Sequence, residues 1–209
     1  IEMEERILKR VTTPELSEFY DQLHTNEGIN ILTETAVSGF IANPQSENQV
    51  GAVSSICGPE SARGPEIVAD LVIVGIGIIP NTELASDAGI ECENCILVDD
   101  HCCTSDANIY AVGDCTNHPN PIMGRRLRLE SVPNAMEQAR VSAANMLGGD
   151  KAYASVPWFW SDQYDLKLQM VGFSADGDTS VLRGDKTLNQ FAVFYLKDGK
   201  VVSVDAVNS

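Results

Sequence analysis

The stretch ANIYAVGDC, at residues 107–115, places a carboxylate at the end of a predicted strand, where it could bind a ligand. Residues 109–112 are apolar and predict a short buried strand, which runs directly into Gly113 and Asp114. A glycine at the carboxyl end of a strand lets a ligand approach the backbone, and open α/β sheets bind ligands at that end. The Asp114 carboxylate offers two acceptor oxygens to hydroxyl donors. An aspartate there can equally cap a helix or close a turn.

A second candidate site is the start of a helix predicted over residues 131–147. Ser131 is a typical N-cap residue, Pro133 falls in the first turn and Gly148 closes the pattern. The N–H groups of a first turn have no partner within the helix and favour negative charge. Val132 therefore offers its backbone to an anion, or, if the helix points elsewhere, it only packs this end against the core.

Six cysteines raise the question of metal or redox chemistry. Cys92 and Cys95 form a C-x-x-C pair, with His101, Cys102 and Cys103 shortly after it. Structural zinc sites usually take two well-spaced ligand pairs, and redox thiol pairs usually open a helix. The residues after Cys95, ILVDD, predict a strand instead. We favour scattered reduced thiols in a cytoplasmic protein, with no metal site.

The most apolar segment is ADLVIVGIGIIPN, residues 69–81, which predicts a fully buried strand of a parallel sheet. Gly75 and Gly77 have the spacing that begins a dinucleotide-binding loop, but Pro80 stands where its third glycine would fall. A tight turn that lets another backbone pass closely is the better interpretation.

The net charge of −16 argues against a nucleic-acid partner, which requires a basic face. Four arginines nevertheless fall within a short stretch: Arg125, Arg126, Arg128 and Arg140. Such a run usually marks a solvated loop and helix face. On an acidic protein it is also a candidate docking surface for an acidic partner. No run of about 20 apolar residues predicts a membrane span, and no secretory signal is visible.

The remaining patterns predict an α/β chain up to about residue 150 and an α+β chain after it. Thr13, Pro14 and Gly28 frame a helix over residues 14–27. Strands are expected at 29–35, 36–42 and 50–56, a turn at 58–65, a short helix at 82–89, and antiparallel strands at 168–173, 179–184, 190–197 and 200–207. Asp198-Gly199 predicts a type I′ turn in the last hairpin.

Three segments, ANIYAVGDC, ESVPNAMEQAR and PWFWSDQY, in this order and spacing, resemble FAD-dependent, NADH-linked ferredoxin reductases of the putidaredoxin and rhodocoxin reductase type. Residues 69–90 and 193–208 fit the same family, so the likeness covers nearly the whole chain. The resemblance implies a flavoprotein fold with two dinucleotide-binding domains, followed by an α+β C-terminal reductase domain. It also implies a cytoplasmic enzyme that passes electrons from NADH through FAD to a small acidic [2Fe–2S] ferredoxin serving an oxygenase.

The resemblance divides the chain into three parts. Residues 1–68 match the second half of an NAD-binding domain, 69–150 the closing half of an FAD-binding domain, and 151–209 an incomplete C-terminal reductase domain. Neither G-x-G-x-x-G fingerprint of the family occurs in this sequence. We therefore expect a C-terminal fragment that is inactive by itself.

For FAD, the resemblance assigns Gly113 and Asp114 to the turn that meets the ribityl hydroxyls. Val132 matches a position where the family contacts the flavin, at the helix terminus that favours the charge of the reduced ring. Trp160 is similar to the family's tryptophan at the flavin edge. Any tryptophan is a core residue by default, and we expect Trp158 to be one.

For NAD, the resemblance assigns Glu2 to the hydrogen bonds with the adenosine ribose hydroxyls. A carboxylate there repels a 2′-phosphate and implies NADH over NADPH, although a solvated surface glutamate is the alternative. Gly75 and Gly77 match the stretch near the nicotinamide. The resemblance names no catalytic acid or base, because the flavin carries the chemistry.

For the partner, Arg140, helped by Arg125, Arg126 and Arg128, is expected to bind the acidic ferredoxin. Where the family tends to place basic residues on the last domain, this chain has Gln169, two residues after Lys167. An enzyme of the same fold with another acceptor, such as rubredoxin or monodehydroascorbate, is therefore an alternative. A second alternative is an NADH-sensing protein like apoptosis-inducing factor, whose nucleic-acid binding the net charge disfavours.

Overall fold

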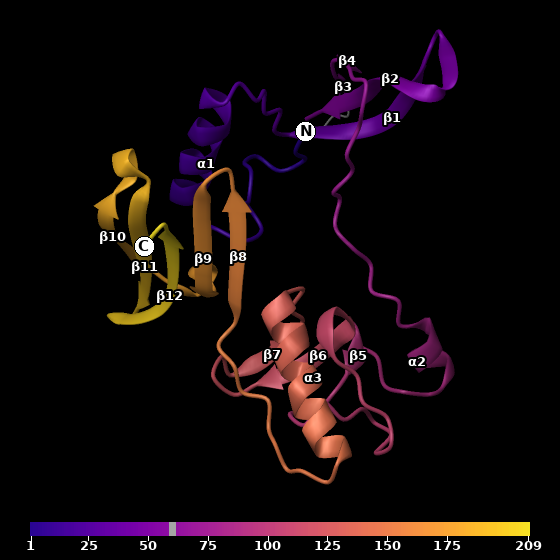
Figure 1. The fold of residues 1–209 in the computed structure, drawn as a ribbon, viewed down its shortest axis with the longest axis vertical. Coiled ribbons are helices and arrows are strands. Elements are labelled where there is room, and N and C mark those ends of the chain that lie inside the picture. The colour runs from indigo at the N-terminus through magenta and orange to yellow at the C-terminus, as the bar shows by residue number, and fades with distance from the viewer. Residues whose placement is uncertain (59–61) are drawn as a thin grey trace. The chain divides into compact units, whose positions relative to one another are not determined.

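The computed structural model describes residues 1–58 and 62–209 of the chain. These residues form two compact units, Ile1–Gly77 and Ile78–Ser209 (Figure 1). The predicted domain limits at residues 68 and 150 stay predictions, and part of the turn predicted at 58–65 lies outside the described residues. None of the described helices is both long enough and apolar enough to cross a membrane.

The first unit consists of one helix and an antiparallel sheet. The predicted helix is confirmed as α1 (Pro14–Asn26), which buries Leu16 and Tyr20 and ends before Gly28 at φ +84°. The sheet contains β1 (Thr35–Asn43), β2 (Ser46–Cys57), and the short β3 (Ala62–Arg63) and β4 (Ile67–Val68), which both pair with β2.

The strand predicted at residues 29–35 is wrong, because β1 begins only at Thr35. The backbone before it bonds to the start of the chain instead, through Glu2 N–H to Leu32 O at 2.8 Å and Glu34 N–H to Glu4 O at 2.9 Å. Glu34 also has φ +49°, a left-handed conformation that a strand does not continue through.

The buried strand predicted at residues 69–81 is also wrong. No described residue pairs with this segment as a strand, and its branched side chains lie in solvent, with Ile73 88% and Ile79 90% exposed. A buried parallel strand needs neighbouring strands to satisfy its backbone and helices to cover its two faces. Gly77, at φ +88°, interrupts the extended backbone as well.

The second unit begins with small elements around one long helix. It contains α2 (Glu83–Asp87), β5 (Ile96–Leu97), the 3₁₀ turn η1 (Gly113–Cys115), β6 (Thr116–Asn120), β7 (Arg125–Leu127) and α3 (Val132–Met146). The three strands form a sheet in the order β5-β6-β7, with β5 and β6 parallel. The prediction of α3 and its caps is confirmed.

The strand predicted at residues 109–112 is wrong in its pairing. Val112 is extended, at φ −143° and ψ 154°, but the segment makes only one isolated bridge, between Tyr110 and Cys103. Likewise, the strand predicted after Cys95 is reduced to the two residues of β5. Apolar, branched residues thus adopt extended backbone here without a neighbouring strand to form a ladder.

The unit ends in a five-stranded antiparallel sheet, in the order β10-β11-β12-β9-β8 (Figure 1). Its elements are β8 (Trp158–Gln163), β9 (Leu166–Gly172), η2 (Ser174–Asp176), β10 (Thr179–Asp185), η3 (Lys186–Leu188), β11 (Gln190–Lys197) and β12 (Lys200–Val207). Alternating residues of β9 are buried. Asp198 at φ +51° and Gly199 at φ +72° confirm the predicted I′ turn.

Candidate functional site

The first turn of α3 opens into a cavity of about 370 Å³ in the second unit. Ser131 and Val132 line it from the helix start, Arg140 lines it two turns on, and Trp158 and Trp160 line it from β8. The structure therefore brings together three of the predicted site residues, Val132, Trp160 and Arg140. The cavity thus has an aromatic side and a side formed by a helix terminus.

The N-terminus of α3 is ordered by its own sequence. Ser131 is extended, at φ −150° and ψ 144°, and its hydroxyl oxygen accepts a hydrogen bond from Asn134 N–H at 3.4 Å. Pro133 has no N–H to satisfy, and the Val132 N–H precedes the first helical carbonyl it could reach. Partial positive charge thus faces the cavity that these residues line.

The aromatic wall consists of two tryptophans on one face of β8. The Trp158 and Trp160 ring centroids are 5.2 Å apart with planes 32° from parallel, and the side chains are 39% and 43% exposed. The prediction that Trp158 is a core residue is wrong, because alternate residues of a strand share one face. Phe159 takes the opposite face, where its ring centroid lies 6.2 Å from that of Phe173.

The Gly113–Asp114 turn is attached to α3. Gly113 has φ +83°, its N–H donates to Gln138 Oε1 at 2.6 Å, and a Cβ there would lie 3.5 Å from Ala135 Cβ. The Asp114 side chain is exposed, and no described residue forms a hydrogen bond or ion pair with its carboxylate. The turn therefore presents two acceptor oxygens that the protein itself leaves available.

Tyr153 lines the cavity and His118 lies against it, and both stay neutral at physiological pH. The Tyr153 hydroxyl donates to Asn134 Oδ1 at 3.0 Å, and burial raises the pKa of Tyr153 to about 12. Its ring meets the buried His118 ring edge-on, at 5.0 Å between centroids. Burial, helped by the charge of Arg126, lowers the pKa of His118 to about 4. Neither side chain is poised as a general acid or base near neutral pH.

We expect His118 to make the protein sensitive to mild acid. Because its folded-state pKa is depressed, its stabilising effect is complete above the unfolded value of about 6.5 and is lost as pH falls towards 4. The displacement corresponds to roughly 3 kcal/mol. His118→Phe should therefore lose less free energy of unfolding between pH 6.5 and 4 than the parent, as measured by urea denaturation.

The control for this prediction is His101→Gln. Hydrogen bonds to Asp100 and Asp150 raise the pKa of His101, so its contribution is present at low pH and is lost as pH rises through the folded value. The His101 variant should not share the acid resistance of His118→Phe. Identical pH profiles for His118→Phe and the parent would contradict the prediction.

Four of the six cysteines have thiols that burial makes harder to ionise. All six are unpaired, and burial raises the pKa of Cys102 to about 11 and also raises those of Cys95, Cys103 and Cys115. Among the described residues, the one group of potential metal ligands that lie together is Asp99, Asp100 and His101, which includes no thiol. That group contains neither Cys92 nor Cys95.

Three of the four arginines predicted to dock a partner do not line the cavity, and each binds another part of the protein. Arg125 makes two 2.9 Å hydrogen bonds to Asp176 and lies over the Phe173 ring. Arg126 donates to Val98 O at 2.7 Å and to Asn117.

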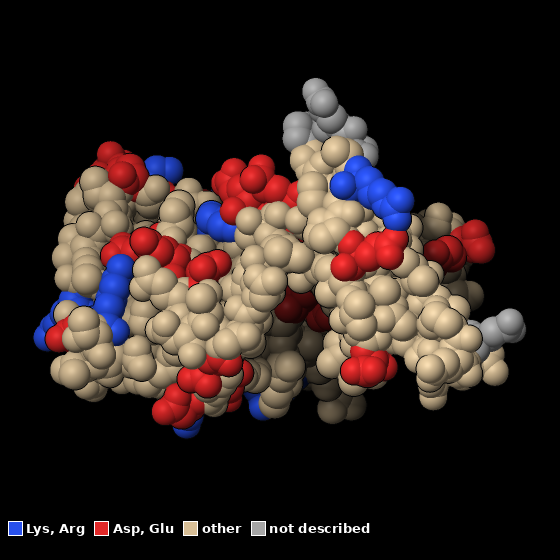
Figure 2. All heavy atoms as spheres, turned by 90° about the horizontal axis from the view of Figure 1, so that it is seen from above, with Lys and Arg blue, Asp and Glu red and all other residues tan. Residues whose placement is uncertain are grey.

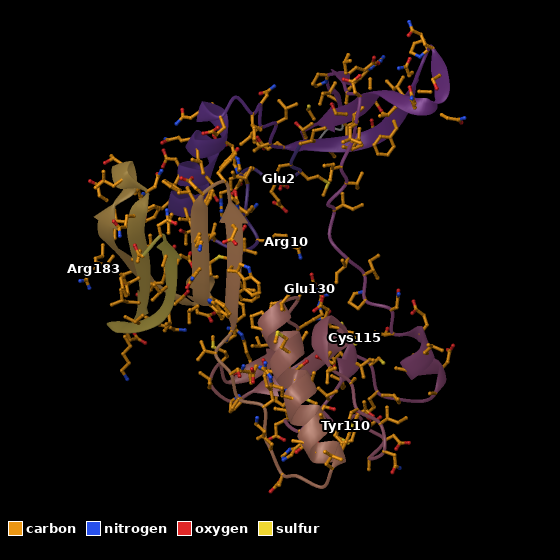
Figure 3. The ribbon with its side chains drawn as sticks, in the orientation of Figure 1. Glu2, Arg10, Tyr110, Cys115, Glu130 and Arg183 are labelled. Carbon is orange, nitrogen blue, oxygen red and sulfur yellow. The ribbon has the colours of Figure 1, made fainter. Side chains whose placement is uncertain are left out.

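Arg128 pairs with Glu130 at 2.5 Å. Glu130, labelled in Figure 3, lies just before α3 in the chain. Of these four arginines, Arg140 is the one that lines the cavity, where it pairs with Glu137. The face drawn in Figure 2 accordingly shows scattered basic side chains among more extensive acidic ones.

The predicted NAD residues belong to the first unit. Glu2 joins two backbone segments there, and its Oε1 accepts a hydrogen bond from Glu4 N–H at 2.9 Å. Gly77 faces Arg10, whose Nη1 would lie 3.7 Å from a Cβ on the glycine, whereas nothing lies within 4 Å of a Cβ on Gly75. Figure 3 labels Glu2 and Arg10.

Sequence reasoning missed several residues of the cavity and its support. Met136, Glu137 and Tyr153 line the cavity, and Gln138 holds the Gly113 turn. A usable signal was present in α3, where Asn134 and Gln138 are one turn apart and so share one face of the helix. Polar residues on a buried helix face need partners, and so they indicate a network.

Comparison with known proteins gives two matching family models. The model described as "Pyridine nucleotide-disulphide oxidoreductase" matches residues 1–139, and the model described as "Reductase C-terminal" matches residues 158–209. Putidaredoxin reductase of Pseudomonas putida is 45% identical over 97% of this chain and 46% of its own length. Rhodocoxin reductase of Rhodococcus erythropolis is 38% identical over 100% of this chain and 47% of its own.

Solved structures give the same picture. The ferredoxin reductase for the CYP199A2 system from Rhodopseudomonas palustris superposes with a TM-score of 0.89 at 38% identity, over 99% of this chain and 49% of that one. The reductase in the covalent putidaredoxin reductase–putidaredoxin complex gives 0.88 at 44% identity, over 99% and 48%. The chain spans about half the length of the curated relatives it matches.

Proposed function

The chain belongs to the pyridine nucleotide-disulphide oxidoreductase family, as its sequence predicted, and we propose that it supplies half of an NADH:ferredoxin reductase. Its similarity to solved reductases over 99% of its length confirms the predicted fold class. Within that fold, we assign the part of the cavity between Val132 and Trp160 to FAD, its Arg140 end to the partner, and the first unit to NAD. The three domain limits predicted from the sequence, 1–68, 69–150 and 151–209, are part of the same proposal.

One observation carries the assignment of FAD: the N-terminus of α3 and the two tryptophans of β8 line the same cavity. The same helix also holds the Gly113–Asp114 turn, through Gln138. These residues fit the chemical parts of a flavin. Trp160 offers an aromatic face to a ring, the Val132 N–H offers a donor to a ring oxygen, and Asp114 offers acceptors to the polyol hydroxyls. When bound, FAD would accept a hydride from NADH and then pass the two electrons singly to the acceptor, with release of a proton.

The first unit is proposed to bind NADH through Glu2. Because Oε1 already accepts the Glu4 N–H, the carboxylate is held in one orientation with Oε2 left for a ribose hydroxyl. Gly75 and Gly77 would lie near the nicotinamide, where the absence of a side chain allows close approach. Apolar residues 69–81 would be covered in the assembled domain.

The proposed acceptor is a small acidic [2Fe–2S] protein that docks on Arg140. This residue is the one predicted docking arginine at the cavity, and it is 56% exposed at its side chain. Arg125, Arg126 and Arg128 would contribute to the local potential, and each also serves the contacts described above. Cytoplasmic location is proposed because the thiols are unpaired.

The proposed function is tested in the full-length reductase by stopped-flow spectroscopy. NADH should bleach the flavin absorption, and a [2Fe–2S] ferredoxin should restore it faster than rubredoxin or monodehydroascorbate does. If rubredoxin or monodehydroascorbate reoxidises the flavin faster, that acceptor, and not a ferredoxin, is the physiological one. Failure of NADH to bleach the flavin would overturn the proposed coenzyme site as well.

We expect coenzyme preference to depend on Glu2. Glu2→Ala combined with Met3→Arg should move the ratio of kcat/KM for NADH over NADPH by about tenfold towards NADPH, since the carboxylate no longer repels a 2′-phosphate and a guanidinium can pair with it. Glu27→Ala, which removes an exposed carboxylate at the end of α1, is the control and should leave the ratio unchanged. An unmoved ratio in the double variant would place Glu2 away from the ribose.

A further inference from the structure

The buried face of α3 is polar where a helix normally presents apolar side chains. Its buried residues are Asn134, Gln138, Val141, Ser142 and Asn145. Burying a carboxamide is costly unless it forms hydrogen bonds, so each amide on this face must hold something. Asn145 holds the backbone at His101 and Lys151, and Asn134 holds Leu129 O and the Tyr153 hydroxyl.

Gln138 holds the turn that precedes Asp114. Its side chain is fully buried, and Oε1 accepts the Gly113 N–H at 2.6 Å. The Thr116 hydroxyl lies 3.1 Å from the same oxygen and 2.8 Å from Gly113 O, and Asn134 Nδ2 lies 3.5 Å from it. Because a backbone N–H is always a donor, the 2.6 Å bond identifies the atom facing Gly113 as the amide oxygen.

The other end of the Gln138 amide lacks a partner. Nε2 is buried and forms no hydrogen bond with any described residue. An unsatisfied buried donor destabilises a protein, and an apolar side chain of the same size would avoid that cost. What such a side chain could not provide is the acceptor for Gly113, whose φ of +83° places the peptide in a conformation that needs support from outside the turn.

We propose that Gln138 is a positioning residue for FAD: its Oε1 fixes the Gly113 peptide and thereby the direction in which the Asp114 carboxylate leaves the turn. The inference rests on the proposed function, in which Asp114 binds the polyol hydroxyls. Gln138 itself is fully buried and acts only through the turn. Without it, the turn would sample orientations in which the carboxylate misses the hydroxyls, and FAD affinity would fall.

The test is a double-mutant cycle in the full-length reductase, with FAD removed and then titrated back while its fluorescence is followed. Gln138→Met keeps the volume and removes the acceptor. It should weaken FAD binding about tenfold when residue 114 is aspartate, and less than twofold in the Asp114→Ala background, because a positioning residue acts through the group it positions. Equal losses in both backgrounds would overturn the inference and indicate a general structural role.

Two further variants complete the test. Gln138→Glu retains an acceptor and should bind FAD more tightly than Gln138→Met, whereas equal weakening by both would overturn the inference. Gln138→Asn, which withdraws the oxygen by one methylene, replaces the Met variant in the cycle if that one does not fold. Asn145→Leu removes a buried amide from the same face without touching Gly113, and it should lower stability but leave FAD affinity unchanged.

The outcome also separates this inference from the function on which it rests. If Asp114→Ala alone leaves FAD affinity unchanged, the assignment of the FAD site fails. If Asp114→Ala weakens binding and Gln138→Met does not, the site stands and the positioning role is refuted.

Discussion

Replacing Asp114 with alanine is expected to weaken FAD binding in the full-length reductase by about 10- to 100-fold. Hydrogen bonds to a charged acceptor contribute about 1.5–3 kcal/mol, which corresponds to that range of affinity. The carboxylate has no partner among the described residues, so its removal should leave the stability of the apoprotein within about 0.5 kcal/mol. Titration of the apoprotein with FAD measures the first quantity, and its urea denaturation measures the second.

Two companion variants sharpen the Asp114 test. Asp114→Asn keeps one acceptor oxygen without the charge and should fall between the parent and the alanine variant. Asp87→Ala removes an exposed carboxylate at the end of α2 and should bind FAD like the parent. Wild-type affinity in Asp114→Ala, or an unstable apoprotein, would show that the residue serves the turn and does not serve the cofactor.

Reversing the charge of Arg140 is expected to slow reduction of an acidic ferredoxin by about tenfold at low ionic strength. The guanidinium steers encounter over a distance that salt shortens, so the defect should shrink as ionic strength rises. Arg140→Glu should leave NADH-dependent reduction of a small neutral acceptor nearly unchanged, since hydride transfer to the flavin does not involve the docking step. Stopped-flow rates of ferredoxin reduction and of neutral-acceptor reduction, each measured across a salt series, test both expectations.

The structure supplies controls for Arg140. Arg183 on β10 lies outside the cavity, so Arg183→Glu makes the same change of charge and should have a much smaller effect (Figure 3). Glu137 pairs with Arg140, so Glu137→Gln should free the guanidinium and speed association at low salt. If Arg140→Glu lowers the rates of ferredoxin reduction and of neutral-acceptor reduction equally, Arg140 has a structural role and does not dock the partner.

The sequence predicted best where the physical signal is local. Ser131, Pro133 and Gly148 each act within a turn of α3, and together they placed its ends within a residue of those observed. The turn at Asp198 and Gly199 is likewise a property of two residues that tolerate positive φ. Four of the five strands of the C-terminal sheet were predicted in this way, whereas β8 was not.

Prediction failed where the outcome depends on neighbours distant in the chain. Residues 69–81 have the composition of a core strand, yet no described residue pairs with them, and a strand exists only as part of a ladder. Residues 109–112 are extended for the same local reasons and remain a single bridge. Composition predicts the preferred backbone conformation, whereas pairing is decided by tertiary contacts.

The candidate site shows the same division. The helix terminus at Val132 and the turn at Gly113 could be predicted, because each depends on adjacent residues. That Arg126 faces backbone carbonyls, and that Trp158 shares the cavity wall with Trp160, depends on packing between separate elements. The pairing of Arg140 with Glu137, three residues apart, was visible in principle as an i,i+3 helix pair.

The two tryptophans that form the cavity wall are also the only two in this chain. All indole emission from these residues therefore originates within one site, with no signal from a remote reporter to subtract. Because the rings lie 5.2 Å apart and are partly exposed, their spectrum responds both to solvent and to each other. An aromatic ligand that enters the cavity is expected to quench this tryptophan fluorescence, so the intrinsic emission would report binding directly.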